Sequence, residues 1–302
     1  MLTRKSLVRT AQVLCIGTAV TLAPVALAAP ASAATLPVAC SETALRTAIN
    51  TANSTPGGDT LNLRPGCSYK LTTELPAITS PVVINGNLAT ITRTSGTFRI
   101  LTVNGGNLTL RSAVLSNGDA TGSPVQNGAG GAIVVTGNGT LNLSGSVIRN
   151  NHAAFGGGVS VFSGSVANLS ADTFTGNSAT QNGGGLVSDG TVTVNLSQFR
   201  GNSAGSAGGG IASIGTLTVN VSNIVNNTAP NGGGGLANGV PSASGGTSKV
   251  TASNISNNSA GGVNPGGIYN NGGTVTLHAD RVAANTPNNC LNSPTVVPGC
   301  IG

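Results

Sequence analysis

A repeat of about 25 residues constrains the fold of this 302-residue chain more than any other feature. Clusters of glycine end at similar intervals, at Gly131, Gly158, Gly185, Gly210, Gly235 and Gly267. A second series keeps step with the first and consists of Asn151, Asn177, Asn202, Asn227, Asn258 and Asn285. Each of these asparagines follows an Ile, Phe or Val by three residues. A fixed period of this length is typical of a solenoid in which one repeat forms one coil.

The segments between the markers have the pattern of strands. Residues 190–196 (GTVTVNL), 215–221 (GTLTVNV) and 273–277 (GTVTL) alternate polar and apolar side chains with period two. A single coil cannot enclose its own apolar face, so the coils must stack, and parallel stacking places equivalent residues ~4.8 Å apart. We therefore predict an all-β fold, a single-stranded parallel β-helix (a solenoid) over residues 59–289 with about 25 residues per coil.

Residues 174–187 (FTGNSATQNGGGLV) illustrate how one coil is built. Phe174 is expected in the core, while Gly176 and Asn177 turn the chain. The glycines at 183–185 permit backbone conformations that a Cβ atom would oppose. Equivalent asparagines in stacked coils are expected to form an amide ladder, in which each side chain bonds its neighbours in the adjacent coils.

The first 33 residues have the features of a signal peptide. Arg4, Lys5 and Arg9 form a positive start, an apolar stretch follows, and the Ala-Ser-Ala of residues 31–33 resembles a cleavage site. We predict that residues 1–33 are removed near Ala33 and that the protein is secreted to the extracellular space. No later stretch reaches the ~20 apolar residues that a membrane-spanning helix needs.

Both ends of the solenoid need covers, because an open coil exposes its core and unpaired strand edges. Residues 34–58 are expected to form an N-terminal cap with a short helix that starts at the N-cap Ser41 and stops at 56–58 (PGG). The apolar residues at helical spacing are Ala44, Leu45, Ala48, Ile49 and Ala52. Residues 290–302 are the expected C-terminal cap.

Four cysteines follow the signal peptide, two near each end of the chain: Cys40, Cys67, Cys290 and Cys300. In an oxidising compartment they are expected to form disulfides, and the local pairs Cys40–Cys67 and Cys290–Cys300 are favoured among the three connectivities. A zinc site is the alternative, but His278 has no evident companion ligand. We expect neither a metal nor a cofactor.

Residues 40–73, which begin CSETALRTAINT, resemble the start of CSLREA-type proteins, in which a Cys precedes a Leu-Arg helix, Gly-Asp-Thr and Pro-Gly. The Gly-Gly-aliphatic and Phe-x-x-Asn repeats are similar to those of chlamydial polymorphic membrane proteins. The resemblance covers residues 40–289 and implies a secreted, right-handed, pectate-lyase-like β-helix of actinobacterial origin. The chain departs from the CSLREA pattern by three extra residues at 42–44. These motifs are structural, so they support a fold rather than an activity.

The acidic residues are spread out along the predicted coils. After the signal peptide they are Glu42, Asp59, Glu74, Asp119, Asp172, Asp189 and Asp280. Asp172 and Asp280 share a column, but they lie four coils, or ~19 Å, apart. Neither the carboxylate pair of a glycoside hydrolase nor the carboxylate cluster of a calcium-dependent lyase is therefore evident.

Two columns offer other candidate sites. Asp119, His152 and Ser178 occupy equivalent positions in three consecutive coils, in the acid, imidazole and hydroxyl order of a nucleophilic triad. The alternative is a polar turn column without an oxyanion hole. Arg149 and Arg200 lie two coils, or ~10 Å, apart in another column. They are candidates to contact an anionic polymer, or they are ordinary solvated arginines.

Two insertions interrupt the repeat, and insertions on a rigid scaffold often carry binding sites. Residues 119–127 precede a glycine cluster and residues 239–249 follow one. They are expected to leave different corners of the coil, so that no shared groove is implied. The chain has no Trp and two tyrosines, Tyr69 and Tyr269, which argues against an extended cleft for stacking sugars.

Three functions are compatible with these patterns. We favour a non-catalytic extracellular protein that binds a polysaccharide or a cell-surface polymer in the manner of an adhesin, or that is structural. The alternative, implied by the resemblance in fold, is a pectate-lyase-like polysaccharide lyase or a glycoside hydrolase. Ice binding is a third candidate, because outward threonine pairs recur at Thr191/Thr193, Thr216/Thr218 and Thr274/Thr276.

Charge argues against a nucleic-acid partner. Removal of the three basic residues of the signal peptide leaves 10 of the 13 basic residues against 7 acidic ones. These ten are scattered along the predicted coils and form no stripe that would follow a phosphate backbone.

Overall fold

The computed structural model describes residues 32–55 and 57–302. The expected signal peptide at 1–33 lies almost entirely outside these residues and stays a prediction. Within the described residues, no helix is long and apolar enough to cross a membrane.

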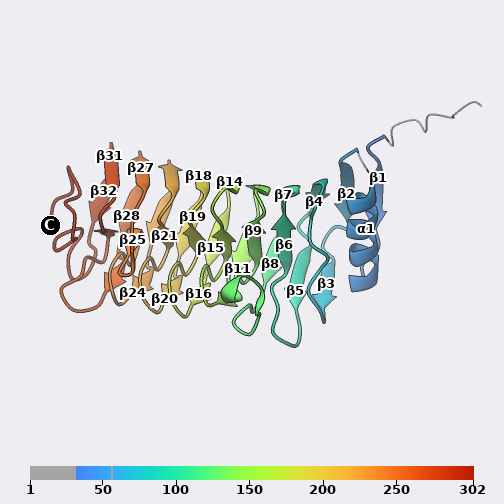
Figure 1. The fold of residues 1–302 in the computed structure, drawn as a ribbon, viewed down its shortest axis with the longest axis horizontal. Coiled ribbons are helices and arrows are strands. Elements are labelled where there is room, and N and C mark those ends of the chain that lie inside the picture. The colour runs from blue at the N-terminus through green and yellow to red at the C-terminus, as the bar shows by residue number, and fades with distance from the viewer. Residues whose placement is uncertain (1–31, 56) are drawn as a thin grey trace, which may run out of the picture. The chain divides into compact units, whose positions relative to one another are not determined.

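Residues 35–283 form four sheets whose strands stack one coil upon the next (Figure 1). Sheet A contains β1 (Thr35–Val38), β2 (Asp59–Leu63), β4 (Pro81–Asn85), β7 (Asn107–Arg111), β10 (Thr140–Ser144), β14 (Val166–Ser170), β18 (Thr191–Asn195), β22 (Thr216–Asn220), β27 (Thr247–Thr251) and β31 (Thr274–His278). Sheet B contains β3 (Ser68–Leu71), β5 (Thr90–Arg93), β8 (Val114–Ser116), β11 (Val147–Arg149), β15 (Thr173–Thr175), β19 (Gln198–Arg200), β23 (Asn223–Val225), β28 (Asn254–Ser256) and β32 (Arg281–Ala283).

The two remaining sheets complete each coil. Sheet C contains β6 (Leu101–Asn104), β9 (Ile133–Thr136), β13 (Val159–Val161), β17 (Leu186–Ser188), β21 (Ile211–Ser213), β25 (Leu236–Val240), β26 (Ala243–Ser244) and β30 (Ile268–Asn270). Sheet D, which forms a bend, contains β12 (His152–Ala153), β16 (Ser178–Ala179), β20 (Ser203–Ala204), β24 (Thr228–Ala229) and β29 (Ser259–Ala260).

The predicted parallel β-helix is confirmed, with about ten coils of roughly 26 residues. Neighbouring strands pair in parallel, as in Val192↔Leu217, and the β25–β26 hairpin is antiparallel. The alternating strands place Val192, Val194 and Leu217 in the continuous core. Phe174 and Phe199 stack inside it with ring centroids 4.4 Å apart. The right hand of the helix, which the family resemblance implies, stays a prediction.

The expected helix α1 (Glu42–Ser54) is present at the N-terminal end. Ser41 caps it, because its Oγ accepts a hydrogen bond from the Ala44 N–H at 3.1 Å. Leu45 and Ile49 are buried against the first coils. Strand β1 already pairs with β2 in sheet A, so part of the predicted cap 34–58 contributes a solenoid strand.

Both favoured disulfides are formed. The Cys40–Cys67 bond joins the segment before α1 to the first complete coil, and the Cys290–Cys300 bond closes a loop after the last strand. Each disulfide therefore secures one end of the solenoid, where a coil has a neighbour on one side only.

The glycine clusters permit the close approach of coils at the bend before sheet C. A Cβ atom added to Gly184 would lie 2.4 Å from the carbonyl oxygens of Ser203 and Gly209 in the next coil. Gly183, in the same cluster, adopts a positive φ of 71°. A larger residue at 184 would therefore push adjacent coils apart.

The six asparagines form the expected amide ladder, buried between sheets B and D. Asn177 shows the pattern: its Nδ2 donates to Asn202 Oδ1 at 3.0 Å and to the Ile148 carbonyl at 2.9 Å. The same Asn202 Oδ1 also accepts the Asn177 backbone N–H. The ladder starts at Asn151 and continues to Asn285, which donates to Asn289 Oδ1 beside the C-terminal disulfide.

A second buried column links sheets A and B and has a serine in most coils. Ser222 is representative, because its Oγ accepts the Ser197 N–H of the preceding coil and donates to the Asn220 carbonyl of its own coil. Asp172 takes this place in one coil, where its two oxygens accept the N–H groups of Ser146 and Ser170. Asp280 bonds in the same way near the C-terminal end.

We predict that N202A lowers the free energy of unfolding by about 3–6 kcal/mol. The substitution leaves the Asn177 amide groups and the Phe174 carbonyl without partners in the interior, at about 1–3 kcal/mol for each group. Denaturant titration followed by circular dichroism measures the change. The control is N195A, because Asn195 is partly exposed on sheet A and an effect below about 1 kcal/mol is expected there. Equal effects of the two variants would contradict a special role for the ladder.

We also predict that stability falls as pH rises from about 4 to about 7, through Asp172. Burial raises the pKa of this carboxyl from its ordinary 3.8 to about 7, although the N–H groups of Ser146 and Ser170 act in the opposite direction. Between these pH values the unfolded state releases the proton while the folded state retains it, so ionisation stabilises the unfolded state and the free energy of unfolding falls until the folded carboxyl also ionises.

D172S tests this prediction, because serine is the usual residue of the column and can still accept the Ser146 N–H. The difference in unfolding free energy between D172S and the unmodified protein should grow in favour of D172S from pH 4 to pH 7. D280S makes the same replacement near the end of the column and controls for the loss of the carboxylate hydrogen bonds. A difference between D172S and the unmodified protein that does not vary with pH would refute the prediction.

Candidate functional site

The structure brings together two of the three residues of the candidate triad. His152 Nδ1 lies 2.6 Å from Ser178 Oγ. Asp119 pairs with His152 through the backbone, but its Oδ1 accepts hydrogen bonds from the N–H and hydroxyl of Thr121 at 3.0 and 2.6 Å. A triad requires the acid to orient the imidazole. Because the Asp119 carboxylate is directed to Thr121, this arrangement is that of a polar turn column.

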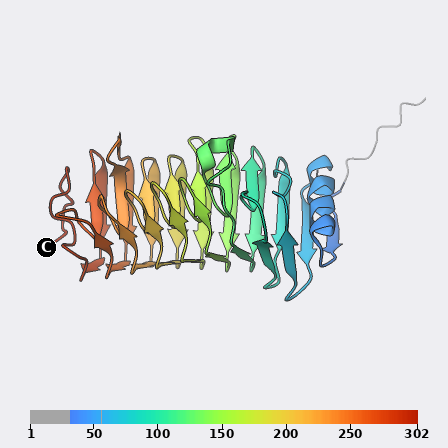
Figure 2. The same ribbon diagram turned by 90° about the horizontal axis from the view of Figure 1, so that it is seen from below.

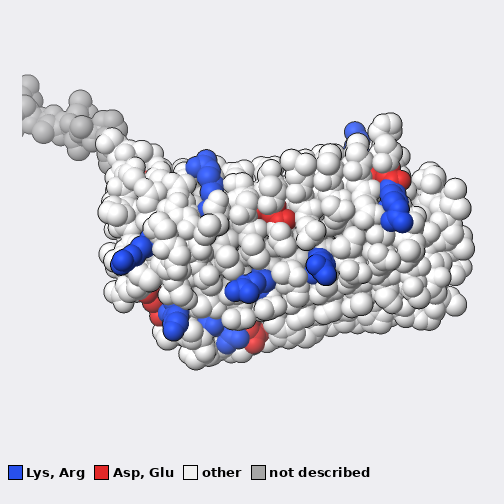
Figure 3. All heavy atoms as spheres, turned by 180° about the vertical axis from the view of Figure 1, so that it is seen from behind, with Lys and Arg blue, Asp and Glu red and all other residues white. Residues whose placement is uncertain are grey.

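Arg149 and Arg200 are exposed on sheet B, in β11 and β19, with Thr175 between them in the same column. This register agrees with the predicted separation of two coils. Figure 3 shows the positive side chains scattered singly over one face of the molecule. The two arginines therefore offer separated contacts to an anionic polymer rather than a continuous stripe.

The threonines considered for ice binding lie on the outer face of sheet A. One column is uninterrupted and runs through Thr191, Thr216, Thr247 and Thr274. The neighbouring column contains Lys249 between Thr218 and Thr276. A charged side chain thus breaks the regular array.

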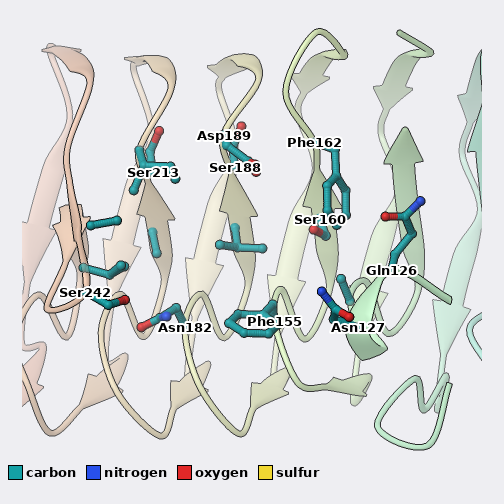
Figure 4. A pocket seen from close by; sticks show the side chains of 16 residues that line it. Gln126, Asn127, Phe155, Ser160, Phe162, Asn182, Ser188, Asp189, Ser213 and Ser242 are labelled. Carbon is teal, nitrogen blue, oxygen red and sulfur yellow. The ribbon is translucent and has the colours of Figure 1, made fainter. Parts of the chain in front are cut away.

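A groove of about 270 Å³ lies on the outer side of sheet C. Its lining comes from coils that are adjacent in space and from both insertions (Figure 4). The lining residues are Gln126, Asn127, Ala129, Phe155, Ser160, Phe162, Asn182, Val187, Ser188, Asp189, Ala212, Ser213, Ile214, Val240, Ser242 and Ala243.

The expectation that the two insertions share no groove is wrong. Gln126 and Asn127 of the first insertion line one end, and Ser242 of the second insertion lines the other end (Figure 4). The coils are stacked in register, so two insertions that follow different strands still extend over the same face of sheet C. Figure 2 shows the first insertion, in green, projecting from the stack of coils.

A buried arginine holds the first insertion in place. Arg99 is fully buried; its Nε donates to the Ala129 carbonyl at 3.1 Å and its Nη2 to the Val125 carbonyl at 2.8 Å. Val125 is the first residue of the short 3₁₀ helix η1 (Val125–Gly128), and Ala129 follows its last residue. Burial lowers the pKa of Arg99, whereas the Glu74 carboxylate, 3.7 Å from Nη1, raises it. The insertion is thus attached through charge-assisted hydrogen bonds to the scaffold.

The second insertion is a hairpin. Strand β25 continues beyond the length of its neighbours and turns back as β26, with Val240 opposite Ala243. Val240 packs with Ala237 and Tyr269 in a small apolar cluster outside the main core. Burial raises the pKa of the Tyr269 hydroxyl. Packing in this cluster holds the hairpin against sheet C and so fixes the second end of the groove.

Two aromatic rings border the groove between its ends. Phe155 lies along one border and Phe162 along the opposite one (Figure 4). They are the two partly exposed phenylalanines among the five in the chain, since Phe98, Phe174 and Phe199 are buried. The two rings therefore present large apolar surfaces to the solvent at the groove. In the next coil, Asn182 takes the position of Phe155 and Asp189 takes the position of Phe162.

Neutral polar groups lie between the two rings. Ser160 is buried on the outward face of β13, at the same level as Val187 and Ala212, whereas Ser188 and Ser213 are buried at the inward-facing position of the core residue Val161. Ser188 Oγ accepts the Gly190 N–H, while Ser213 Oγ has no hydrogen-bond partner within residues 32–302. The amides of Gln126 and Asn182 add further donors and acceptors.

Asp189 is the one ionisable residue in this lining. It lies in the turn between β17 and β18, and its side chain is exposed. Nearby protein atoms that displace water raise the pKa of its carboxyl, although the backbone N–H groups of Asp189 and Ser163 lower it. A hydrolytic carboxylate pair would need a second acid here. Across the described parts of the chain, no three His, Cys, Asp or Glu side chains gather as a metal-binding group.

The sequence pattern gives no direct indication of the groove residues. Arg99 is one of ten basic residues scattered along the coils, and Asp189 is one of the isolated acids. One signal was available for the rings, because Phe155 and Phe162 are aromatic residues outside the core position that precedes each ladder asparagine by three. Their common location on sheet C depends on the fold of the bend and became evident only in the structure.

We predict that R99M loosens the first insertion and leaves the coils intact. Methionine retains apolar volume but leaves the carbonyls of Val125 and Ala129 without the buried donor, and hydrogen bonds to charged groups contribute about 1.5–3 kcal/mol each. Hydrogen exchange read by mass spectrometry should be at least about tenfold faster over residues 121–128 and unchanged in the hairpin 239–246. Unchanged exchange over 121–128 would show that Arg99 does not hold the insertion.

No protein-family model matches the sequence, and no curated protein matches it. Among solved structures, the chain is similar to an alginate lyase from Paenibacillus sp. str. FPU-7, with 15% sequence identity and a TM-score of 0.40. The similarity covers 83% of this chain and 97% of the lyase. The resemblance to CSLREA-type and chlamydial repeat proteins stays a prediction.

Proposed function

We propose that this is a secreted, non-catalytic carbohydrate-binding protein and that the groove on sheet C is its binding site. The observation that carries the proposal is the pairing of two partly exposed phenylalanine rings with hydroxyl and amide groups in the lining of one groove. Phe155 and Phe162 form the apolar borders, and Ser160, Gln126 and Asn182 are among the polar groups.

Sugars match this combination because a pyranose ring has apolar C–H faces and a polar rim of hydroxyl groups. The faces pack on aromatic side chains, and the rim needs precisely oriented donors and acceptors of the kind that serine, asparagine and glutamine supply. Small-molecule sites generally combine apolar walls with a few convergent polar groups in this way. The groove therefore fits a short carbohydrate segment.

The scaffold is suited to holding a ligand in a preformed site. Sheet C is fixed by backbone hydrogen bonds between every pair of neighbouring coils, and Arg99 and the hairpin fix the two ends of the groove. Preorganised sites of this kind lose little conformational entropy when a ligand binds. The two disulfides are compatible with an oxidising extracellular environment, where polysaccharides and cell-surface polymers are available partners.

A polysaccharide lyase or glycoside hydrolase that acts in the same groove is the second candidate. The raised pKa of Asp189 favours it, because general acids in active sites often have raised pKa values. His152 and Ser178, with their 2.6 Å contact, and the exposed Arg149 and Arg200 lie outside the groove lining and would act elsewhere on the surface.

We predict that F155A and F162A each weaken carbohydrate binding at least about fivefold. Each removes an aromatic contact worth about 1 kcal/mol and leaves the coil hydrogen bonds in place. The purified, disulfide-intact protein is screened against neutral and acidic polysaccharides, and the affinity for each bound polymer is then measured by calorimetry. L196A is the control, because Leu196 is 63% exposed but lies outside the groove.

The same samples are assayed for reducing ends and for unsaturated products that absorb in the ultraviolet. Binding without product, lost in the two phenylalanine variants and retained in L196A, is the expected result. Product formation abolished by D189N would replace the proposal by the enzymatic candidate. Product formation abolished by H152A and not by D189N would direct attention to the His152 column. Binding that all three alanine variants retain would exclude the groove.

A further inference from the structure

Asp189 lies between the ends of the groove, on the same border as Phe162. The two residues occupy the same position in successive coils, because the preceding residues Val161 and Ser188 are paired in register. The next coil places Ile214 at this position, after Ser213. The carboxylate is therefore flanked by apolar side chains along this border, and Figure 4 shows it above the buried Ser188.

No cation in the lining offsets this negative charge. The lining contains no Lys, Arg or His, and the ion pairs formed by the described residues are Arg46–Glu42 and Arg99–Glu74. Arg99 lies behind one end of the groove, but it is fully buried and bonded to two carbonyls. A ligand in the groove therefore meets neutral donors and acceptors and one uncompensated carboxylate.

We propose that the groove selects neutral glycans and rejects uronate-containing ones, with Asp189 as the residue that determines this specificity. The inference rests on the proposed carbohydrate-binding function. A carboxylate accepts hydrogen bonds from vicinal sugar hydroxyls, which favours a neutral ring. The same carboxylate repels an acidic ring, and discrimination between partners commonly uses such repulsion in addition to attraction.

The magnitude of the effect follows from the distance between the charges. Two carboxylates about 5–6 Å apart repel by about 1–3 kcal/mol at a protein surface, depending on the effective dielectric constant. Each 1.4 kcal/mol corresponds to a tenfold change in affinity. One unpaired carboxylate is therefore sufficient to favour a neutral sugar over its uronate counterpart by roughly tenfold at low ionic strength.

Matched trisaccharides test this inference. The probes are β-1,4-mannotriose with β-1,4-trimannuronate, and α-1,4-galactotriose with α-1,4-trigalacturonate, each titrated calorimetrically at pH 7.5 in low salt. The unmodified protein should bind a neutral member at least about tenfold more tightly than its uronate. D189N should reduce this ratio to about threefold or less, mainly by improved binding of the uronate. Added salt at ~0.5 M should also reduce the ratio, because it screens the repulsion.

Two controls isolate the effect of Asp189. D119N removes the same charge outside the groove and retains an acceptor for Thr121, so it should leave the ratio unchanged. An R149Q/R200Q background removes two exposed cations that lie on sheet B and could capture uronates independently of the groove.

The outcomes separate the two proposals. Failure to bind either member of both pairs, together with no binding in the polysaccharide screen, would overturn the proposed function and the inference with it. Binding of a neutral trisaccharide that F155A weakens, with the same neutral-to-uronate ratio in D189N as in the unmodified protein, would overturn the inference alone. Preference for a uronate in the R149Q/R200Q background would also overturn the inference and retain the groove as a carbohydrate site.

Discussion

The hydrogen bonds between buried asparagines are the constraint on which the rest of this structure depends. From Asn177 to Asn285, each ladder side chain donates two hydrogen bonds and accepts two, within its own column and with neighbouring backbone groups. A coil that slipped by one residue would place a neighbour such as Gly201 or Ser203 where Asn202 now lies and leave buried polar groups without partners. The ladder therefore specifies register as well as contributing stability. The serine column and the Phe174–Phe199 stack depend on the same register.

The groove arises where the coils differ from one another. Positions that contact the next coil, such as Gly184 and Asn202, repeat because a replacement would disturb two coils at once. Positions that face outward beside sheet C do not have to fit against the next coil. They therefore differ between successive coils, as where Asn182 replaces Phe155 and Asp189 replaces Phe162. The regular part of the repeat thus provides rigidity, and the irregular part provides a surface with its own chemistry.

The fold could be predicted because its main determinants are local and periodic. The strands, the N-terminal helix, the amide ladder and both disulfides follow from spacing, composition and cellular compartment. The candidate site is harder to predict from the sequence. Alignment of the repeats shows which residues occupy equivalent positions in successive coils, but it does not show which group each side chain contacts. Asp119 is level with His152 and still bonds Thr121. The meeting of the two insertions depends on the path of the bend, for which the sequence has no simple signal.

Because the strands of sheet C stack in register, the length of the groove depends on the number of coils between the two insertions. One end lies at the coil that carries η1 and the other at the coil that carries the β25–β26 hairpin, and each coil between them adds one strand to the base of the groove. Duplication of an intervening repeat would lengthen the groove by ~4.8 Å and leave its cross-section unchanged, whereas deletion of one would shorten it by the same step. Relatives that differ by whole repeats between the insertions would therefore have grooves of different lengths, each suited to a ligand of a different length.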